Sequence, residues 1–319
     1  MKVIQAIIQP FGCLLVLVTT LAAALHGQQR SASSYQVPQN TSIQVDVNLT
    51  LVGVTVTNRR GEYVQGLSAE NFKLLEDKVE QKIEYFSAED IPVSIGLILD
   101  ISGSMKSAAS VAHDATVAFL KEGNRDDEYF LVEFNERPMV AEDFTTDTRR
   151  LEDRIKGAAA MGPTALYDAV HVALDKLRQG TRPRKAILLI SDGEDNNSRY
   201  SFRTIEEFAR EQDAAIYAIG ILPEKESPSR MLHRSGHEVL EGLTSVTPGR
   251  AFFTSSTRNL EMICRQIAQE IRSQYLLGYR STNTLRDGQW RKISVRMIPP
   301  HGASRITVRA RPGYYAAAR

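Results

Sequence analysis

The uncharged run Val93–Leu99, which ends at Asp100, is the feature that most constrains how this chain can fold. An apolar run of this length is typical of a parallel β-strand buried on both faces. Asp100, Ser102 and Ser104 follow at a spacing of two, and Gly103 lets the backbone turn tightly between the two hydroxyls. Because ligands of open α/β sheets bind beyond the carboxyl ends of the strands, we expect these side chains to form part of a binding site.

The oxygen-bearing side chains of this loop favour a hard divalent cation. Mg²⁺ takes oxygen ligands in near-octahedral geometry and keeps some waters, and one carboxylate with two hydroxyls cannot complete that geometry. Thr164, in the tight loop Met161–Thr164, and Asp192, after the second apolar run Ile187–Ile190, are candidates for the missing ligands. Taken alone, the first loop favours the cap of a helix N-terminus, whereas the three loops together favour a cation site.

Five residues of these loops together resemble the metal-ion-dependent adhesion site of von Willebrand factor type A domains. They are Asp100, Ser102, Ser104, Thr164 and Asp192. The resemblance covers about Pro92–Ser273 and implies a doubly wound, mostly parallel α/β sheet of Rossmann-like type. It also implies that Mg²⁺ or Mn²⁺ binds these residues and that an acidic residue of a partner protein completes the coordination. Pro163 departs from the pattern, because relatives commonly have a second glycine before the threonine.

The segment after Asp100 alternates between strand and helix patterns. Strands are expected at 128–134, 139–144, 185–190, 214–221 and 250–253, the second of them antiparallel at the sheet edge. Helices are expected at 107–121, 151–160, 165–178, 202–212 and 260–272. Such alternation predicts a parallel sheet covered by helices on both faces.

Segments rich in β-strand pattern flank this block on both sides. In the N-terminal flank, Phe72–Glu76 and Gln81–Phe86 are expected to pair across the loop 77–80. In the C-terminal flank, strand patterns occur at 275–279, 289–298 and 305–310. Each flank has too few strands for a core of its own. We therefore expect residues 43–91 and 274–319 to form one small discontinuous β-sandwich-like domain into which residues 92–273 are inserted.

The mature chain as a whole is similar to the bacterial exported family of VWFA-related domain proteins. The motifs behind this similarity are Val54-x-Val-Thr57-Asn-Arg-Arg-Gly61, Leu67-x-x-x-x-Phe72, Glu76-Asp77, Ile83-x-x-Phe86, Tyr275-x-Leu-Gly-Tyr279 and Gly313-Tyr-Tyr315. They extend the resemblance over both flanks.

The N-terminus has the pattern of a secretory signal peptide. Lys2 precedes the apolar run Phe11–Leu25, whose 15 residues fall short of the ~20 that span a bilayer. We assign residues 1–27 to the signal peptide and residues 28–42, which are rich in Gln, Ser and Asn, to a flexible linker. The mature protein is then exported, to the periplasm, the cell surface or the medium. The alternative is an uncleaved leader that anchors the chain in a membrane.

Charge and cysteine content narrow the choice of partners and compartments. The net charge of +1 provides no large positive field for nucleic acid. Without the leader, Cys264 has no partner for an internal disulfide, and its helical apolar pattern indicates an inert core thiol; a reactive or dimer-forming thiol is the alternative. The nine Lys and Arg residues from Arg280 onward, against Asp287 alone, indicate a solvated strand face. The alternative is a docking face for an anionic partner or wall polymer.

These observations favour a non-enzymatic module that binds partner proteins through a divalent cation. A metal-dependent hydrolase and a purely structural envelope protein are the alternatives. A serine hydrolase would need a Gly-x-Ser-x-Gly elbow, which neither Ser102 nor Ser104 has, and no phosphate-binding glycine loop is present. A zinc pair at His233 and His237 lacks the His-Glu-x-x-His order, and a structural role leaves the five-residue set unexplained.

We predict that the mature N-terminus lies between about Leu25 and Arg30, just after the small residues 22–24. N-terminal sequencing of protein from the exported fraction measures it. A chain that begins at Met1 in a membrane fraction would contradict a cleaved leader and support an anchor.

Overall fold

The computed structural model describes residues 49–157, 160–221, 235–298 and 306–318, which all belong to one compact unit. The predicted signal peptide and linker lie outside the described residues, as do residues 43–48 and His233. None of the described helices is long and apolar enough to cross a membrane.

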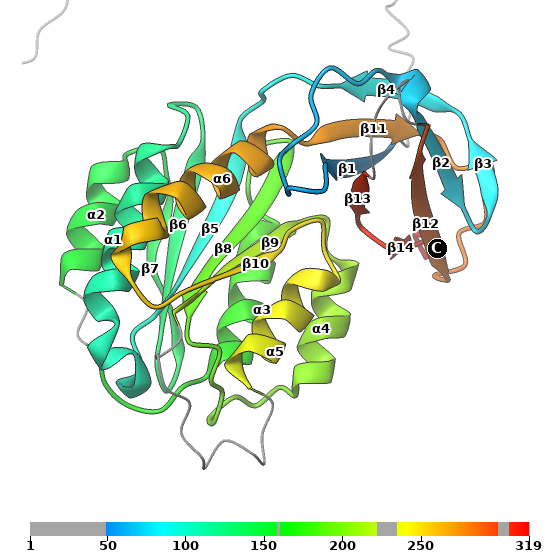
Figure 1. Cartoon of the computed structure of the whole chain (residues 1–319). Helices are drawn as coiled ribbons and strands as arrows, with labels where there is room; N and C mark the ends of the chain where they lie inside the picture. The colour runs from blue at the N-terminus through cyan, green and yellow to red at the C-terminus, as the bar shows by residue number, and fades with distance from the viewer. Residues whose placement is uncertain (1–48, 158–159, 222–234, 299–305, 319) are drawn as a thin grey trace, which may run out of the picture. The chain divides into compact units, whose positions relative to one another are not determined.

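A six-stranded sheet forms the centre of the α/β part, in the order β10-β9-β8-β5-β6-β7 (Figure 1). Its strands are β5 (Val93–Asp100), β6 (Glu128–Phe134), β7 (Pro138–Thr145), β8 (Arg184–Ser191), β9 (Ala215–Ile221) and β10 (Ala251–Thr254). All neighbouring strands are parallel except β7, which pairs antiparallel with β6 at the edge. The mostly parallel sheet with an antiparallel edge strand is therefore confirmed.

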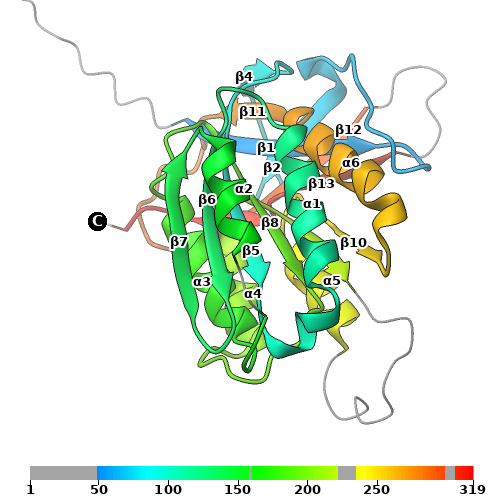
Figure 2. The same ribbon diagram turned by 90° about the vertical axis from the view of Figure 1, so that its left-hand side faces the viewer.

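Helices cover both faces of this sheet (Figure 1 and Figure 2). One face packs against α1 (Ala109–Lys121), α2 (Thr148–Lys156) and α6 (Leu260–Arg272). The other face packs against α3 (Leu166–Leu177), α4 (Phe202–Glu211) and α5 (Gly236–Ser245). Within α6, Cys264 is fully buried and its thiol donates to the carbonyl of Ala115. Burial raises the pKa of this thiol to about 12, and the core position predicted for the cysteine is confirmed.

Two four-stranded antiparallel sheets form the β part, in the orders β13-β1-β11-β4 and β14-β12-β2-β3. The N-terminal flank supplies β1 (Thr50–Thr57), β2 (Phe72–Glu76), β3 (Val79–Gln81) and β4 (Ile83–Ser87). The C-terminal flank supplies β11 (Tyr275–Tyr279), β12 (Trp290–Met297), β13 (Thr307–Ala310) and β14 (Gly313–Tyr315). Both sheets contribute to one apolar core, which includes Val54, Leu74, Leu277 and Ile293. The two flanks thus fold together, as the shortage of strands in each predicted.

Arg184, the first residue of β8, holds both ends of the inserted segment. Its guanidinium donates to the main-chain carbonyl of Glu89, before β5. It also donates to the carbonyls of Arg272, the last residue of α6, and Gln274, just before β11. The arginine is only 4% exposed. The two chain crossings therefore lie side by side, as the insertion of a compact domain with neighbouring ends requires.

The pairing expected for Phe72–Glu76 is wrong. β2 pairs with the short strand β3 across a turn of two residues, Asp77 and Lys78, whose φ angles are 47° and 71°. Positive φ at both central residues is what a two-residue type I′ hairpin requires. Because this turn closes earlier than expected, β3 ends at Gln81, and the following strand β4 pairs with β11 in the other sheet.

Sequence patterns predicted neither α5 nor β14. The signal for α5 is a capping box, in which Ser235 accepts a hydrogen bond from the main chain of Glu238 and the Glu238 side chain reaches back. Within α5, His237 stacks on Phe253, with ring centroids 3.8 Å apart. This stacking accounts for the one member of the suggested histidine pair that the structure describes.

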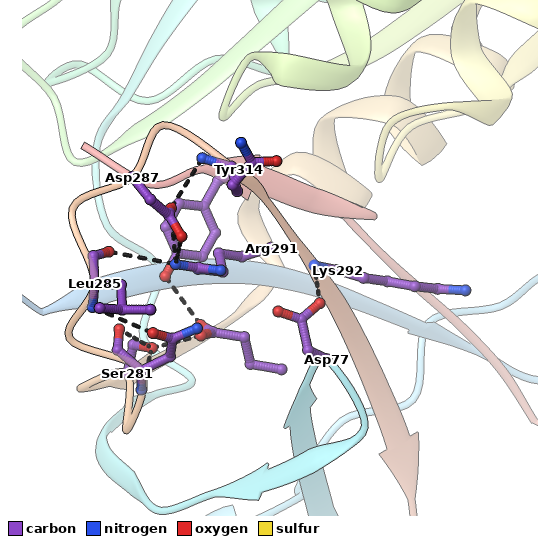
Figure 3. A network of polar contacts seen from close by, with 10 residues as sticks. Asp77, Ser281, Leu285, Asp287, Arg291, Lys292 and Tyr314 are labelled. Carbon is purple, nitrogen blue, oxygen red and sulfur yellow. Dashed lines mark hydrogen bonds and ion pairs between the residues drawn. The ribbon is translucent and has the colours of Figure 1, made fainter. Parts of the chain in front are cut away.

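Two arginines of the C-terminal flank form buried or partly buried ion pairs. Arg291 is 6% exposed and donates to both carboxylate oxygens of Asp287, at 2.9 and 3.0 Å (Figure 3). Arg309 of β13 pairs with the buried Glu270 of α6 at 2.9 Å. The expectation of a solvated basic face is therefore wrong for these residues. Counting charges along the C-terminal flank missed Glu270, because this carboxylate comes from the α/β part.

Glu76, at the end of β2, is a buried carboxylate held by hydroxyl groups. It accepts hydrogen bonds from Tyr279 at 2.6 Å, from Tyr314 at 2.9 Å and from Ser281. Figure 3 shows Ser281 and Tyr314 in this network. Glu76 is 2% exposed, so these hydroxyls replace the water that a charged group would otherwise need. Since Tyr279 belongs to one sheet and Tyr314 to the other, the network joins the two layers of the β part.

We predict that Tyr314→Phe lowers the free energy of unfolding by about 1–3 kcal/mol, because it removes one donor from a buried carboxylate. Urea denaturation of wild type and variant measures the difference. Tyr315→Phe is the matched control, since Tyr315 is 54% exposed, and we expect it to change stability by less than about 0.5 kcal/mol. Equal stabilities of the Tyr314→Phe variant and wild type would contradict the role given to the hydroxyl.

A chain that ends at Ser273 should lose the structure of its N-terminal flank. The truncation removes both neighbours of β1, which are β11 and β13. It also removes β12, one of the two neighbours of β2. We expect limited proteolysis to cut residues 50–87 rapidly while the helices and strands of the α/β part stay protected. Protection of residues 50–87 equal to that in the full chain would show that the flanks fold independently.

Candidate cation site

The candidate residues lie on three loops at the carboxyl end of the parallel sheet. Asp100 is the last residue of β5, and Asp192 directly follows β8. These two strands are adjacent, with Leu99 opposite Ile190. Thr164 lies on the loop that leads into α3. The sheet topology therefore brings residues from distant parts of the sequence to one edge, as the strand-end pattern predicted.

Asp100 is 2% exposed, and both of its carboxylate oxygens are hydrogen-bonded. Oδ1 accepts from the main-chain N–H of Ser102 at 2.9 Å, and Oδ2 accepts from the hydroxyl of Ser191 at 2.6 Å. Burial raises the pKa of Asp100 to about 7; the hydrogen bonds of Ser102 and Ser191 oppose this rise, and the charge of Asp192 adds to it. The carboxylate is thus fixed in orientation, while its charge lacks compensation.

The two serines of the first loop present their hydroxyls to each other. Ser102 Oγ and Ser104 Oγ are 3.0 Å apart; Ser102 is fully buried and Ser104 is exposed. Of the other two candidates, Thr164 is 1% and Asp192 is 4% exposed. Oδ1 of Asp192 accepts the main-chain N–H of Glu194 at 3.0 Å. Each predicted residue therefore lies on one of the three loops, and all except Ser104 are buried.

Main-chain hydrogen bonds join the first loop to the loop that carries Thr164. Gly103 N–H donates to the carbonyl of Gly162 at 2.8 Å, and Met161 N–H donates to the carbonyl of Ile101 at 2.9 Å. Gly162 has a φ of 82°, a conformation that favours glycine. Pro163, which stands in place of the second glycine of the pattern, leaves Thr164 buried next to this junction.

Ser191 is a functional candidate that sequence reasoning missed. Besides donating to Asp100, its hydroxyl accepts the N–H of Gly193 at 2.9 Å. Gly193 has a φ of 80°, and a side chain there would collide with the backbone of Gly236 at the start of α5. The only sequence signal was a serine at the end of an apolar strand, which does not by itself distinguish a hydrogen-bonding role from a turn.

The donor set of this site suits a hard cation. Asp100 and Asp192 are buried, and among the described residues no Lys, Arg or His forms an ion pair with either. A divalent cation would compensate two such carboxylates, and carboxylates with hydroxyls are oxygen ligands of the kind Mg²⁺ takes. The described residues contain no group of three or more His, Cys, Asp or Glu placed to hold a metal ion. Hydroxyl groups would therefore have to complete the set.

Residues 95–194 match the family model of the von Willebrand factor type A domain, and this segment contains all five candidate ligands. No curated protein matches the chain. Solved structures similar to it include the PilB minor pilin from Streptococcus sanguinis, with 12% identity, a TM-score of 0.47 and coverage of 58% of this chain and 62% of the pilin. The conserved hypothetical protein BatB from Bacteroides thetaiotaomicron has 16% identity, a TM-score of 0.46 and coverage of 57% and 100%. A von Willebrand factor type A protein from Catenulispora acidiphila has 12% identity, a TM-score of 0.48 and coverage of 85% and 75%.

Proposed function

We propose that the segment 95–194, which matches the family model of the von Willebrand factor type A domain, belongs to a domain that binds a partner protein through a divalent cation. The observation that carries the proposal is the burial of Asp100 and Asp192 together without a basic partner in the described part of the chain. In this proposal Mg²⁺ or Mn²⁺ is held by Asp100, Ser102, Ser104, Thr164 and Asp192, with water in the remaining positions.

The charges of the site favour capture of an acidic residue. Two carboxylates balance a divalent cation, and the hydroxyls of Ser102, Ser104 and Thr164 add no further charge. A bound ion would supply a Lewis-acidic position that an aspartate or glutamate of the partner could occupy. Ser191 and the N–H of Ser102 keep the Asp100 carboxylate in a fixed orientation for this role.

We infer that the domain acts by binding rather than by catalysis, as an adhesion or assembly module of an exported protein. Neither Ser102 nor Ser104 lies in a nucleophile elbow, and their hydroxyls contact each other. The signal-peptide pattern of residues 1–27 supports export.

We predict that the purified chain binds about one Mg²⁺ or Mn²⁺, and that Asp100→Ala abolishes this binding because it removes half of the compensating charge. Isothermal titration calorimetry measures both proteins. Asp153→Ala is the matched control, because its side chain is 78% exposed on α2, and it should bind as wild type does. Equal binding heats for wild type and Asp100→Ala would overturn the site.

The partner is tested by affinity capture from exported proteins with Mg²⁺, with a chelator, and with Asp100→Ala as bait. We expect a protein that is retained by wild type with Mg²⁺ only. Substituting the acidic residues of that protein one at a time should then identify one whose loss releases it. Retention that is independent of both the chelator and Asp100 would overturn the proposed mode of binding.

A further inference from the structure

We propose that Asn196 is the positioning residue that sets the location of Thr164 in the candidate cation site. This inference rests on the proposed function, since it concerns a ligand of that site. Asn196 lies four residues after Asp192, on the loop between β8 and α4, and sequence patterns gave it no role.

Both the N–H and the carbonyl of Thr164 form hydrogen bonds with Asn196, and the carbonyl also bonds with Asn197. The Thr164 N–H donates to Asn196 Oδ1 at 2.8 Å. The Thr164 carbonyl accepts from the main-chain N–H groups of Asn196 at 3.0 Å and Asn197 at 2.9 Å. These three bonds use only the main chain of Thr164, so they fix its position while leaving its hydroxyl uncommitted to Asn196.

The buried main-chain N–H of Thr164 needs an acceptor inside the protein. Proline has a fixed φ and no N–H, so the first main-chain donor after Gly162 is the N–H of Thr164. This donor belongs to a residue that is 1% exposed, and a buried N–H has to find a partner inside the protein. Asn196 Oδ1 is that partner.

The loop that carries Asn196 also caps the helix that follows Thr164. Helix α3 begins after Ala165, which provides no capping side chain, so its first N–H groups need acceptors from elsewhere. Tyr167 N–H donates to Asp195 Oδ1 at 3.3 Å, and Asp168 N–H donates to Ser198 Oγ at 3.1 Å. The first turn of α3 is thus hydrogen-bonded to the loop after β8 through Asp195 and Ser198, which lie on either side of Asn196 in the sequence.

The buried carboxylate of Asp168, in the first turn of α3, accepts hydrogen bonds from the same loop. It is 4% exposed and accepts from the N–H groups of Arg199 at 3.0 Å and Tyr200 at 3.2 Å. These contacts do not depend on the side chain of Asn196. Loss of that side chain should therefore leave the loop docked and release only the N–H of Thr164.

The inference is tested by the Mg²⁺ dissociation constants of wild type, Asn196→Ala and Asn196→Asp, measured by calorimetry on the full mature chain. Removing the partner that orients a ligand typically weakens metal binding by 10–100-fold, and we expect about this loss for Asn196→Ala. Asn196→Asp keeps the Oδ1 acceptor and should bind Mg²⁺ as tightly as wild type or more tightly. Asn259→Ala is the matched control, because Asn259 is exposed and its side chain makes no capping hydrogen bond at α6.

Hydrogen exchange of the peptide that contains Thr164, measured without metal, provides the second readout. We expect faster exchange in Asn196→Ala and unchanged exchange in Asn196→Asp and Asn259→Ala. Unchanged Mg²⁺ affinity in Asn196→Ala, in a series where wild type binds and Asp100→Ala does not, would overturn the positioning role alone. If wild type binds no Mg²⁺, the proposed function is overturned, and hydrogen exchange still decides whether Asn196 holds Thr164.

Discussion

Complete burial of the strand β5 is the constraint on which the rest of this structure depends. All eight residues of Val93–Asp100 are buried, because β6 and β8 flank the strand and helices cover both faces of the sheet. The strand therefore ends in a carboxylate with little access to water. A buried charge needs hydrogen bonds or an opposite charge. Asp100 obtains the hydrogen bonds from its own loop and from Ser191 of the next strand, so the loops at this edge are built around it.

A second buried carboxylate, Glu270 of α6, links the α/β part to the β part. It is 1% exposed and pairs with Arg250, just before β10, and with Arg309 of β13. Burial raises the pKa of the Glu270 carboxyl, and the two guanidinium groups oppose that rise. Arg250 also donates to the carbonyl of Gly61, in the N-terminal flank. Two arginines from different segments thus compensate one charge, as Asp100 and Asp192 would jointly compensate a cation in the proposed site.

The sequence predicted the central sheet and the pairing of the two flanks. It missed one local turn, the helix α5 and the side-chain contacts of Ser191 and Asn196. The uncharged run Val93–Leu99 indicates a strand buried on both faces, so the central strand could be predicted, and the candidate residues at its end could be placed at the carboxyl edge of the sheet. The discontinuous β part followed from the shortage of strands in each flank. The hairpin of β2 could not be placed correctly, because Asp77 and Lys78 adopt positive φ only to satisfy a two-residue turn. Ser191, at the end of an apolar strand, and Asn196, in a loop, carry no sequence signal for their contacts, which form only when the fold brings Asp100 and Thr164 against them.

The way in which the three loops are joined determines what a substitution at the site can change. Ile101 N–H donates to the carbonyl of Phe134, and the bonds of Gly103 with Gly162 and of Met161 with Ile101 continue the connection. All of these are main-chain hydrogen bonds, so replacing the carboxylate of Asp100 removes charge but leaves them in place. The first two loops are therefore preorganised by the backbone. The loop of Asp192 is joined to them through the hydrogen bond of Ser191 with Asp100 and the bonds of Thr164 with Asn196 and Asn197. Preorganisation lowers the entropic cost of binding. Under the proposed function, cation binding would therefore change the charge of the site and not the positions of the joined loops. An acidic residue of the partner would respond to that change in charge.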